Sequence, residues 1–338
     1  MAQSDLNDLL ELADFLDNVC TGQIRRRMRK RTEGLYRIAR EIQGRPLSLL
    51  ATESMSKSVK KGDAVLILTG AGHGINIPKG ETDGPPGAAV LSLSMIKALG
   101  AKIILVAEDD YMGPIAECCH TLGLSSIEHP FPKAHDLAKV EAQKIFQQYD
   151  PRLVVSIERL GPNSNGIMHS LMGEDWSMFH GALHEVVLHA NSKQVPSIGI
   201  GDGGNEIGAG RIVERAMPYI LNGEICRCPC RGGTACDIRT DVFVVGANSN
   251  WAAYAIAACL SAQTKTREAF HNSKLERALI ERCVSAGAKN GPSATPILAI
   301  DNVSIDADTA FVQLLDSALT DFLANPQLVT RRLSTYDR

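Results

Sequence analysis

The stretch at residues 64–100 constrains the fold of this chain more than any other. It opens with the short apolar run Ala64–Leu68, whose length and β-branched content are typical of a buried strand. A glycine-rich loop follows and ends in the turn Gly84–Gly87, which reads GPPG. Proline suits the first turn of a helix, so the apolar residues recurring over Ala88–Leu99 predict a helix that Gly100 ends. The stretch therefore predicts half of a βαβ unit.

The rest of the chain continues this alternation of strand and helix. Further apolar runs predict strands at 102–107, 126–129, 153–157, 197–200 and 241–245. Helical patterns occupy 114–122, 134–148, 176–190, 251–262, 275–286 and 309–324. Strands that are apolar along most of their length and alternate with helices predict an α/β fold, with a mostly parallel sheet covered by helices on both faces.

The first 60 residues show a different pattern. They predict helices with a break at Gly44–Pro46, and we expect a helical N-terminal extension. This extension packs against the sheet as an added layer or serves as a dimer arm, and we expect a homo-oligomer. Residues 61–338 then form the α/β catalytic domain.

Composition and charge argue against several classes of protein. No apolar run approaches the roughly 20 residues of a membrane span, and a net charge of −3 does not favour nucleic acid. The basic run at 25–31 suits an anion or nucleic-acid contact, but a solvated helix face or an oligomer contact explains it better. The acidic N-terminus lacks the cationic start of a targeting peptide, so we expect a cytoplasmic protein whose nine cysteines are reduced.

Acidic residues follow three of the predicted strands at the point where each strand ends. Glu81 and Asp83 follow the first strand, Glu158 follows 153–157, and Asp202 and Glu206 follow 197–200. Taken singly, each acid also suits a helix cap or a solvated loop. Because the carboxyl ends of parallel strands share one edge, we expect the five acids to converge there. Like charges raise each other's pKa, so such a cluster calls for a compensating cation.

Two kinds of cation are available to this predicted cluster. One is a metal ion, and oxygen ligands favour Mg²⁺, Mn²⁺ or Ca²⁺ over zinc. The other is a nearby basic side chain, Arg159 or Lys79. The glycines at 70–74 suggest a nucleotide loop instead, but their spacing departs from G-x-G-x-x-G. No clear acid follows the second strand at the expected distance either, so we favour the metal site over a dinucleotide cofactor.

Two further groups contain residue types that bind metals. His180 and His184 are one helical turn apart, but HGALHE lacks the order of a zincin motif, and packing of an amphipathic helix explains them better. Four cysteines crowd one loop: Cys226, Cys228, Cys230 and Cys236. They either hold a structural metal or form a plain reduced loop. We expect the reduced loop, because C-x-C-x-C-x₅-C is not a pair of C-x₂-C motifs.

Four segments resemble the D-glutamate cyclase family. They are ETDGPPGA at 81–88, IERLG at 157–161, GIGDGGNEIG at 199–208 and SNW at 249–251. The resemblance extends over roughly residues 64–324 and implies a lyase that closes D-glutamate to 5-oxo-D-proline with loss of water. Two positions differ from the family pattern, because Asn165 stands where relatives carry an acid and Met172 where they carry arginine.

The acidic loops and this resemblance together predict the roles of individual residues. As metal ligands for Mn²⁺ or Mg²⁺ we expect Glu81, Asp83, Asp202 and Glu206. In catalysis we expect Glu158, Arg159 and Asn205. As contacts to a small amino acid or lactam substrate we expect Lys79, Thr82, Ser249 and Asn250. The predicted function is a metal-dependent lyase. The alternatives are a metal-dependent hydrolase that opens a small lactam or amide, and a non-catalytic metabolite-binding protein.

Overall fold

A computed structural model describes residues 3–324, and its centre is a parallel sheet. The strands are β1 (Ala64–Leu68), β2 (Lys102–Ala107), β3 (Ile127–Pro130), β4 (Leu153–Ile157), β5 (Ser197–Gly201) and β6 (Val242–Val245). Their order is β3-β2-β1-β4-β5-β6, and every pair is parallel. This is the order of a doubly wound fold, in which the chain builds one half outward from β1 and returns to build the other from β4.

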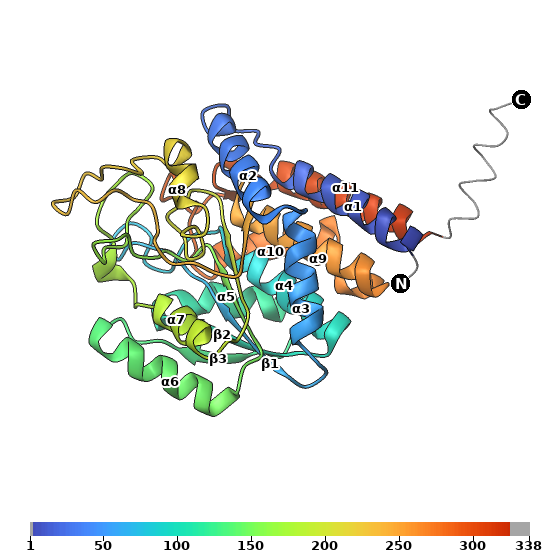
Figure 1. Ribbon diagram of the computed structural model, residues 1–338, viewed down its shortest axis with the longest axis horizontal. Helices are drawn as coiled ribbons and strands as arrows, with labels where there is room; N and C mark the ends of the chain where they lie inside the picture. Colours follow the sequence, from blue (N-terminus) through green and yellow to red (C-terminus); the bar gives the residue numbers. More distant parts are fainter. Residues whose placement is uncertain (1–2, 325–338) are drawn as a thin grey trace, which may run out of the picture.

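Helices cover both faces of the sheet, which confirms the predicted α/β fold (Figure 1). One face carries α4 (Pro85–Leu99), α5 (Asp109–Thr121) and α9 (Ser249–Thr264). The other carries α6 (Ala138–Tyr149) and α7 (His184–Ser192). An outer layer over α4, α5 and α9 contains α1 (Gln3–Cys20), α10 (Ser273–Ser285) and α11 (Ile305–Leu323), and α3 (Leu47–Ser58) packs against both α9 and β6. At the β6 edge lie α2 (Arg29–Gln43) and the short α8 (Val213–Ala216).

The N-terminal helices share the core of the α/β part. Strands β1, β4, β5 and β6 are buried along their whole length, as expected for a sheet covered on both faces. Leu9, Leu16, Leu35 and Leu47 lie in the same apolar cluster as these strands. In Figure 1, α1 and α11 lie side by side although they come from opposite ends of the chain. The added layer is therefore part of the fold, while the domain boundary near residue 60 stays a prediction.

Three elements differ from those predicted. Helix α5 begins at Asp109 and runs through Pro114, although the proline suggested a helix start. Helix α7 begins only at His184, and the preceding segment forms a 3₁₀ turn at Ser177–Phe179 whose Phe179 O accepts a hydrogen bond from the hydroxyl of Tyr111. A small antiparallel sheet of β7 (Ala299–Ile300) and β8 (Val303–Ser304), which the sequence pattern did not reveal, precedes α11.

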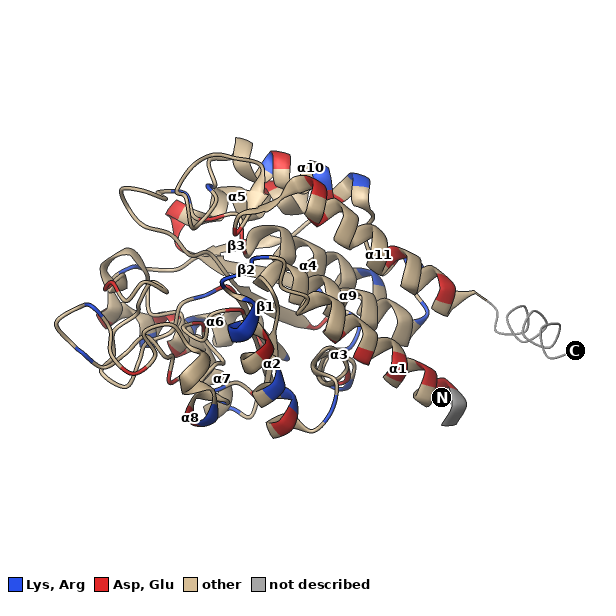
Figure 2. Cartoon of the chain, turned by 90° about the horizontal axis from the view of Figure 1, so that it is seen from above, with Lys and Arg blue, Asp and Glu red and all other residues tan. Residues whose placement is uncertain are grey.

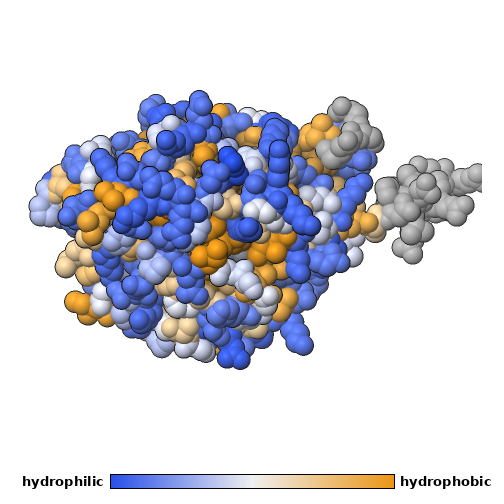
Figure 3. All heavy atoms as spheres, turned by 90° about the horizontal axis from the view of Figure 1, so that it is seen from below, coloured by the Kyte–Doolittle hydropathy of each residue, from blue (hydrophilic) through white to orange (hydrophobic). Residues whose placement is uncertain are grey.

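The surface shows scattered charge and small apolar groups. Figure 2 shows basic residues on α2, and Figure 3 shows a face where hydrophobic groups are separated by hydrophilic ones. Within residues 3–324, no helix is long and apolar enough to span a bilayer.

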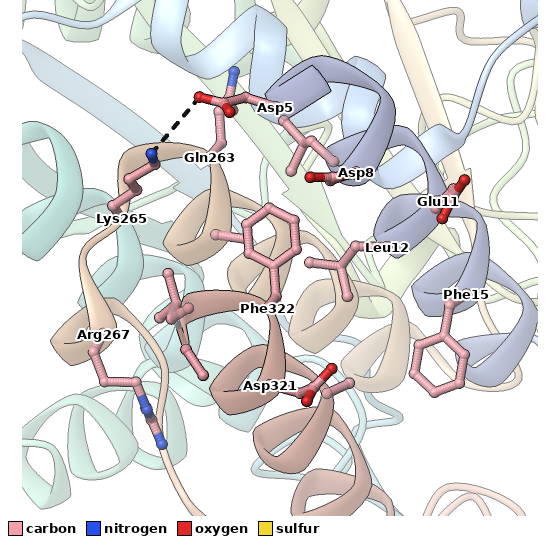
Figure 4. Close-up of a pocket in the computed structure, with 15 residues that line it drawn as sticks. Asp5, Asp8, Glu11, Leu12, Phe15, Gln263, Lys265, Arg267, Asp321 and Phe322 are labelled. Atoms are coloured by element: carbon pink, nitrogen blue, oxygen red, sulfur yellow. Dashed lines mark ion pairs between the residues drawn. The ribbon is translucent and has the colours of Figure 1, made fainter. Parts of the chain in front are cut away.

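A hollow of about 800 Å³ lies between α1, α9 and α11 (Figure 4). Leu12, Phe15 and Phe322 line it, and Asp5 and Lys265 face each other across one side at 3.8 Å. It lies at the C-terminal end of α9. The loops that follow the strands meet at the other end of this helix, so the hollow is separate from the site described next.

Candidate functional site

Five acidic side chains converge beyond the carboxyl ends of β1, β4 and β5, next to the point where the sheet reverses its winding. Carboxylate oxygens of Asp83, Asp202 and Asp301 all lie within 4.8 Å of one another, and those of Glu158, Asp202 and Glu206 form a second such group. Asp202 belongs to both groups. We call these five residues the acidic cluster. The structure thus brings four of the five predicted acids together and adds Asp301.

Asp83 is fixed by the N-terminus of α9. Its two carboxylate oxygens accept hydrogen bonds from the backbone N–H groups of Ser249 and Asn250, each at 2.9 Å. Asn250 holds the start of α4 in return, since its Oδ1 accepts from Gly84 N and Gly87 N, each at 2.9 Å. Asn250 was predicted to contact the substrate. Its side chain instead forms hydrogen bonds within the protein, and these bonds connect the start of α4 to the start of α9.

Glu158 turns the chain at the end of β4 and points into the cluster. Its φ of 44° lies in the left-handed region, which costs a non-glycine residue energy and is maintained by the surrounding structure. The hydroxyl of Ser249 donates to Glu158 Oε2 at 2.5 Å. Ser249, a predicted substrate contact, thus orients the Glu158 carboxyl.

Glu206 is held by the loop to which it belongs. Its carboxylate accepts from the backbone N–H groups of Gly203 and Gly204, each at 2.8 Å. A Cβ at position 201 would lie 2.5 Å from Oε2 of Glu206, so glycine there lets the carboxylate lie close to the backbone. The GDGGNE segment is therefore a backbone cradle that aims Asp202 and Glu206 at the same place.

Asp301 is a member of the cluster that sequence reasoning missed. It lies in the two-residue turn of the β7–β8 hairpin, where Asp301 and Asn302 both have positive φ, as a type I′ turn requires. Asn290 fixes this turn, since its Oδ1 accepts from Asn302 N at 2.7 Å. An Asp-Asn pair between two short apolar runs is a signal for a tight turn. The Asp-Asn pair predicts a turn, but it does not predict that this turn lies next to the acidic loops.

Arg25 reaches the acidic cluster from the segment before α2. Its guanidinium donates to Asp301 Oδ2 at 2.7 Å and to Asp202 Oδ2 at 3.1 Å, and a further bond goes to the carbonyl of Ala247. Burial lowers the pKa of Arg25, but Asp301 and Asp202 together raise it above its usual value. The basic run was expected to be a solvated face or an oligomer contact. Its first residue instead contacts the acids, while Arg26 and Arg27 are exposed.

The pKa values of the acids show that negative charge in the cluster is poorly balanced. Burial, with the charge of Asp301 added, raises the pKa of Asp83 to about 7 although backbone N–H groups oppose the shift. Burial and the neighbouring carboxylates also raise the pKa of Glu158 and of Asp202 well above the usual range. Backbone N–H groups limit the rise at Glu206. The single positive charge of Arg25 therefore does not balance the negative charge of the cluster, which favours binding of a further cation.

Glu81 lies beside the cluster rather than within its two groups. Its side chain is half-buried, and its carboxylate approaches Gly291, where a Cβ would lie 2.0 Å from Oε2. Burial and the charges of Asp301 and Asp83 raise its pKa well above the usual range. Asp301 is also half-buried, so these two acids mark the side from which solvent reaches the cluster.

Arg159, which was expected to act in catalysis, points away from the cluster. The side chain is fully buried and forms a two-pronged ion pair with Glu108, at 2.7 Å and 2.5 Å. Its terminal nitrogens also donate to the carbonyls of Gly70 and Gly181. The side chains of Glu158 and Arg159 point in different directions because the chain turns at Glu158. Arg159 thus ties three loops together and offers no terminal N–H to a substrate.

The remaining predicted residues divide between structural contacts and the surface. Thr82 donates through Oγ1 to Ala299 O at 2.7 Å, which links the first acidic loop to β7. Asn205 donates through Nδ2 to His169 O at 3.0 Å. Lys79 is exposed. The structure therefore shows two of these side chains bonded to the protein and brings none of the three into the acidic cluster.

His180, one of the two histidines considered as metal ligands, holds loops instead. His180 precedes α7 and is buried, with Nε2 accepting from Gly72 N at 3.2 Å and Nδ1 donating to Trp176 O at 3.1 Å. Burial, together with the charge of Arg159, lowers the pKa of His180 well below its usual value. A neutral ring with one donor and one acceptor fits both bonds.

The donor set of the acidic cluster fits a divalent cation. Each of its two groups offers three carboxylate oxygens, and carboxylate oxygen is the ligand that Mg²⁺ and Mn²⁺ prefer in proteins. The raised pKa values give the same indication, since the single positive charge of Arg25 does not balance these acids.

Fold and site together define a doubly wound α/β protein with an acidic cluster at its topological switch point. The family described as D-glutamate cyclase-like, C-terminal, matches residues 38–316. The chain therefore belongs to that family.

Two known proteins show the range of similarity. Human "D-glutamate cyclase, mitochondrial" (Homo sapiens) is 28% identical over 280 residues, which cover 79% of this chain and 40% of the human protein. The chain thus spans about 40% of the length of that relative. A ligand-bound mutant of O-ureido-L-serine synthase aligns with 83% of this chain and 73% of its own, at 13% identity and a TM-score of 0.19.

Proposed function

We propose that this chain is a divalent-cation-dependent lyase of the D-glutamate cyclase type. It converts an acidic amino acid to its five-membered lactam with loss of water, and D-glutamate is the substrate that we propose first. Family membership and the name of the human relative support the substrate class. The observation that carries the proposal is the pair of carboxylate groups sharing Asp202 at the carboxyl edge of the sheet.

The acids of the cluster would hold the cation, with Asp202 common to both groups of ligands. Asp83 and Asp301 complete one group, and Glu206 belongs to the other, in which we assign Glu158 to proton transfer rather than to the cation. When bound, the cation supplies a Lewis acid that stabilises the negative charge developing on the reacting carboxyl group. We propose Mn²⁺ or Mg²⁺ because all of these donors are carboxylate oxygens.

Glu158 is suited to move the protons of this reaction. Ring closure joins the amine nitrogen to the side-chain carboxyl carbon, and one oxygen of that carboxyl leaves as water. Burial and the neighbouring carboxylates raise the pKa of Glu158. A carboxyl with a raised pKa is suited to donate a proton to the leaving oxygen. The resulting carboxylate then accepts a proton from the nitrogen. Ser249 fixes the orientation of the carboxyl through the bond to Oε2.

The test is turnover by the full chain with a small substrate panel. The panel contains D-glutamate, L-glutamate and both enantiomers of 5-oxoproline, each with Mn²⁺, with Mg²⁺ and with a chelator. Mass spectrometry follows the loss or gain of one water. We expect loss of water from D-glutamate with the cation and none with the chelator. Gain of water by a lactam as the faster reaction would identify ring opening as the main activity.

Two variants and a control connect the activity to the cluster. Glu158→Gln should lower kcat by about 10²–10⁴-fold with KM kept, since it removes the proton carrier. Asp202→Asn should weaken cation binding, and Asp136→Asn, at an exposed position before α6, serves as the control. Cation binding without turnover on any substrate would show a non-catalytic binding protein. Activity that persists with the chelator and in Asp202→Asn would contradict the proposal.

A further inference from the structure

Three cysteines and a histidine converge at a second place, in the long loops beyond β4 and β5. The Sγ of Cys226 lies 3.5 Å from that of Cys228 and 3.3 Å from that of Cys230. Nε2 of His169 lies 3.2 Å from the Sγ of Cys228 and 3.6 Å from that of Cys230. All four ligand atoms lie within 4.8 Å of one another. This set is separate from the acidic cluster and shares no residue with it.

The spacing of these atoms matches the corners of a coordination tetrahedron. Zn–S and Zn–N bonds of about 2.3 Å and 2.0–2.1 Å place neighbouring ligand atoms of a tetrahedral site roughly 3.5–3.8 Å apart. The observed separations of 3.2–3.6 Å are close to these edges. They are much longer than a disulfide bond of about 2.05 Å, and all nine cysteines are free thiols.

The sequence favoured a plain reduced loop, and this ligand set also differs from the four cysteines that were considered as the alternative. Cys236 lies in the same loop but is directed elsewhere, since its Sγ accepts from Ile238 N at 3.3 Å and lies against Gly161. His169 takes the fourth corner although it is 59 residues from Cys228. Sequence spacing failed because one ligand comes from a different loop, and only folding brings it to the three cysteines.

We propose that Cys226, Cys228, Cys230 and His169 bind one Zn²⁺ in a closed structural site. Thiolate and imidazole donors in a tetrahedron select zinc over the hard cations that suit the acidic cluster. Four protein ligands leave no open position for a substrate, so the site is structural. The proposal is independent of the catalytic function proposed above.

The site fastens the loops that carry the acids. Backbone N–H groups of Arg227 and Cys228 both donate to Gly173 O, so the cysteine loop already lies along the loop after β4. The carbonyl of His169 accepts the side-chain amide of Asn205, the neighbour of Glu206. Zinc bound at His169 therefore fixes the residue that anchors the GDGGNE segment.

Metal content tests the proposal on the wild-type chain. The full chain, purified without added metal or chelator, should contain one zinc per chain by elemental analysis. Three thiols should react with a thiol reagent only after zinc is removed. Substitution by Co²⁺ should give the intense visible absorption of tetrahedral thiolate coordination. A wild-type chain that takes up neither Zn²⁺ nor Co²⁺, and whose thiols react freely, would overturn the proposal without any variant.

Variants then test which side chains are the ligands. Cys228→Ser and His169→Gln should each lose most of the zinc, whereas Cys236→Ser should keep it. Asp202→Asn should also keep it, which separates this site from the acidic cluster. Loss of zinc from Cys236→Ser with retention in His169→Gln would show that the ligand assignment is wrong.

Discussion

Asp83 accepts hydrogen bonds from backbone N–H groups at the start of α9, and Asn250 in α9 accepts from backbone N–H groups at the start of α4. Asp83 itself precedes α4, and the N–H groups that Asn250 holds are those of Gly84 and Gly87. The Asn250 amide also donates to Thr82 O at 3.0 Å. The two helix starts are thereby fixed against each other directly beneath the acidic cluster.

Replacing Asn250 should therefore lower stability more than substrate affinity. Asn250→Ala removes the acceptor of Gly87 N–H and the donor to Thr82 O, while Gly84 N–H keeps a bond to Asp83 Oδ1 at 3.1 Å. Each buried group left without its partner costs about 1–3 kcal/mol. We expect the free energy of unfolding to fall by about 2–5 kcal/mol in urea titrations. Asn18→Ala, at an exposed position of α1, is the control. Unchanged stability with a strongly raised KM would restore the predicted role of Asn250 as a substrate contact.

Arg25 should compete with a bound cation for Asp202 and Asp301. Arg25→Gln removes the positive charge that now contacts both acids, so the metal-free chain should melt at a lower temperature. Affinity for Mn²⁺ should rise by about tenfold or more, which corresponds to about 1.4 kcal/mol. Calorimetric titration measures this affinity, with the exposed Arg26→Gln as the control. Weaker Mn²⁺ binding in Arg25→Gln would show that Arg25 supports the cation site.

The buried pair of Arg159 and Glu108 should contribute to stability. Removing one charge of such a pair costs about 3–5 kcal/mol, so Glu108→Gln should lower the free energy of unfolding by that order. Arg159→Lys keeps the charge but loses the two-pronged geometry, so it should lower the free energy of unfolding by less. Arg152 forms an exposed ion pair with Asp150 just before β4, the strand that Arg159 follows. Arg152→Lys should change the free energy of unfolding by less than about 1 kcal/mol. Unchanged stability together with a large increase in KM would show that Arg159 contacts the substrate instead.

The fold was predictable where local pattern decides it. The strands at 64–68, 102–107 and 153–157 have the bounds expected from the apolar runs, because a strand buried on both faces leaves a continuous apolar signal. The β7–β8 hairpin left no such signal, since each of its strands has two residues. Pro114 misplaced the start of α5, because local rules do not record the packing that tolerates a proline inside a helix.

The site was predictable in so far as parallel topology determines it. Convergence of Asp83, Glu158, Asp202 and Glu206 follows from acids placed after strands that share one edge. Arg25 and Asp301 come from segments outside the alternating pattern, so no spacing rule connects them to the cluster. The direction of Arg159 depends on a buried partner, Glu108, at the end of another strand.

Stability should fall as pH rises because of Asp308 in α11. Its carboxyl is buried and accepts from Trp251 Nε1 at 2.6 Å, while Oδ2 has no partner within residues 3–324. Burial, with the charge of Glu276 added, raises the pKa of Asp308 well above the usual range. A carboxyl with a raised pKa in the folded state stabilises that state below its unfolded pKa of about 4. This contribution is lost as pH rises through the folded value.

Thermal melts of Asp308→Asn between pH 5 and pH 8 check this expectation. The wild-type chain should lose more stability over this interval than the variant, because the variant has no proton to release at position 308. Asp306→Asn, on the exposed side of the same helix, should keep the wild-type pH dependence. Equal pH dependence in wild type and Asp308→Asn would mean that Asp308 is already ionised in the folded protein.

Binding of Mn²⁺ to the metal-free full chain, compared with Asp202→Asn, tests the central claim most directly. Asp202 is the residue that both carboxylate groups share, and its substitution by asparagine keeps the size of the side chain. Electron paramagnetic resonance counts free Mn²⁺ during the titration, and the exposed Asp136→Asn is the control. The account predicts saturable binding in wild type and in Asp136→Asn, and an affinity at least about tenfold lower in Asp202→Asn, or about 1.4 kcal/mol. Equal binding by all three proteins, or none by the wild-type chain, would contradict it.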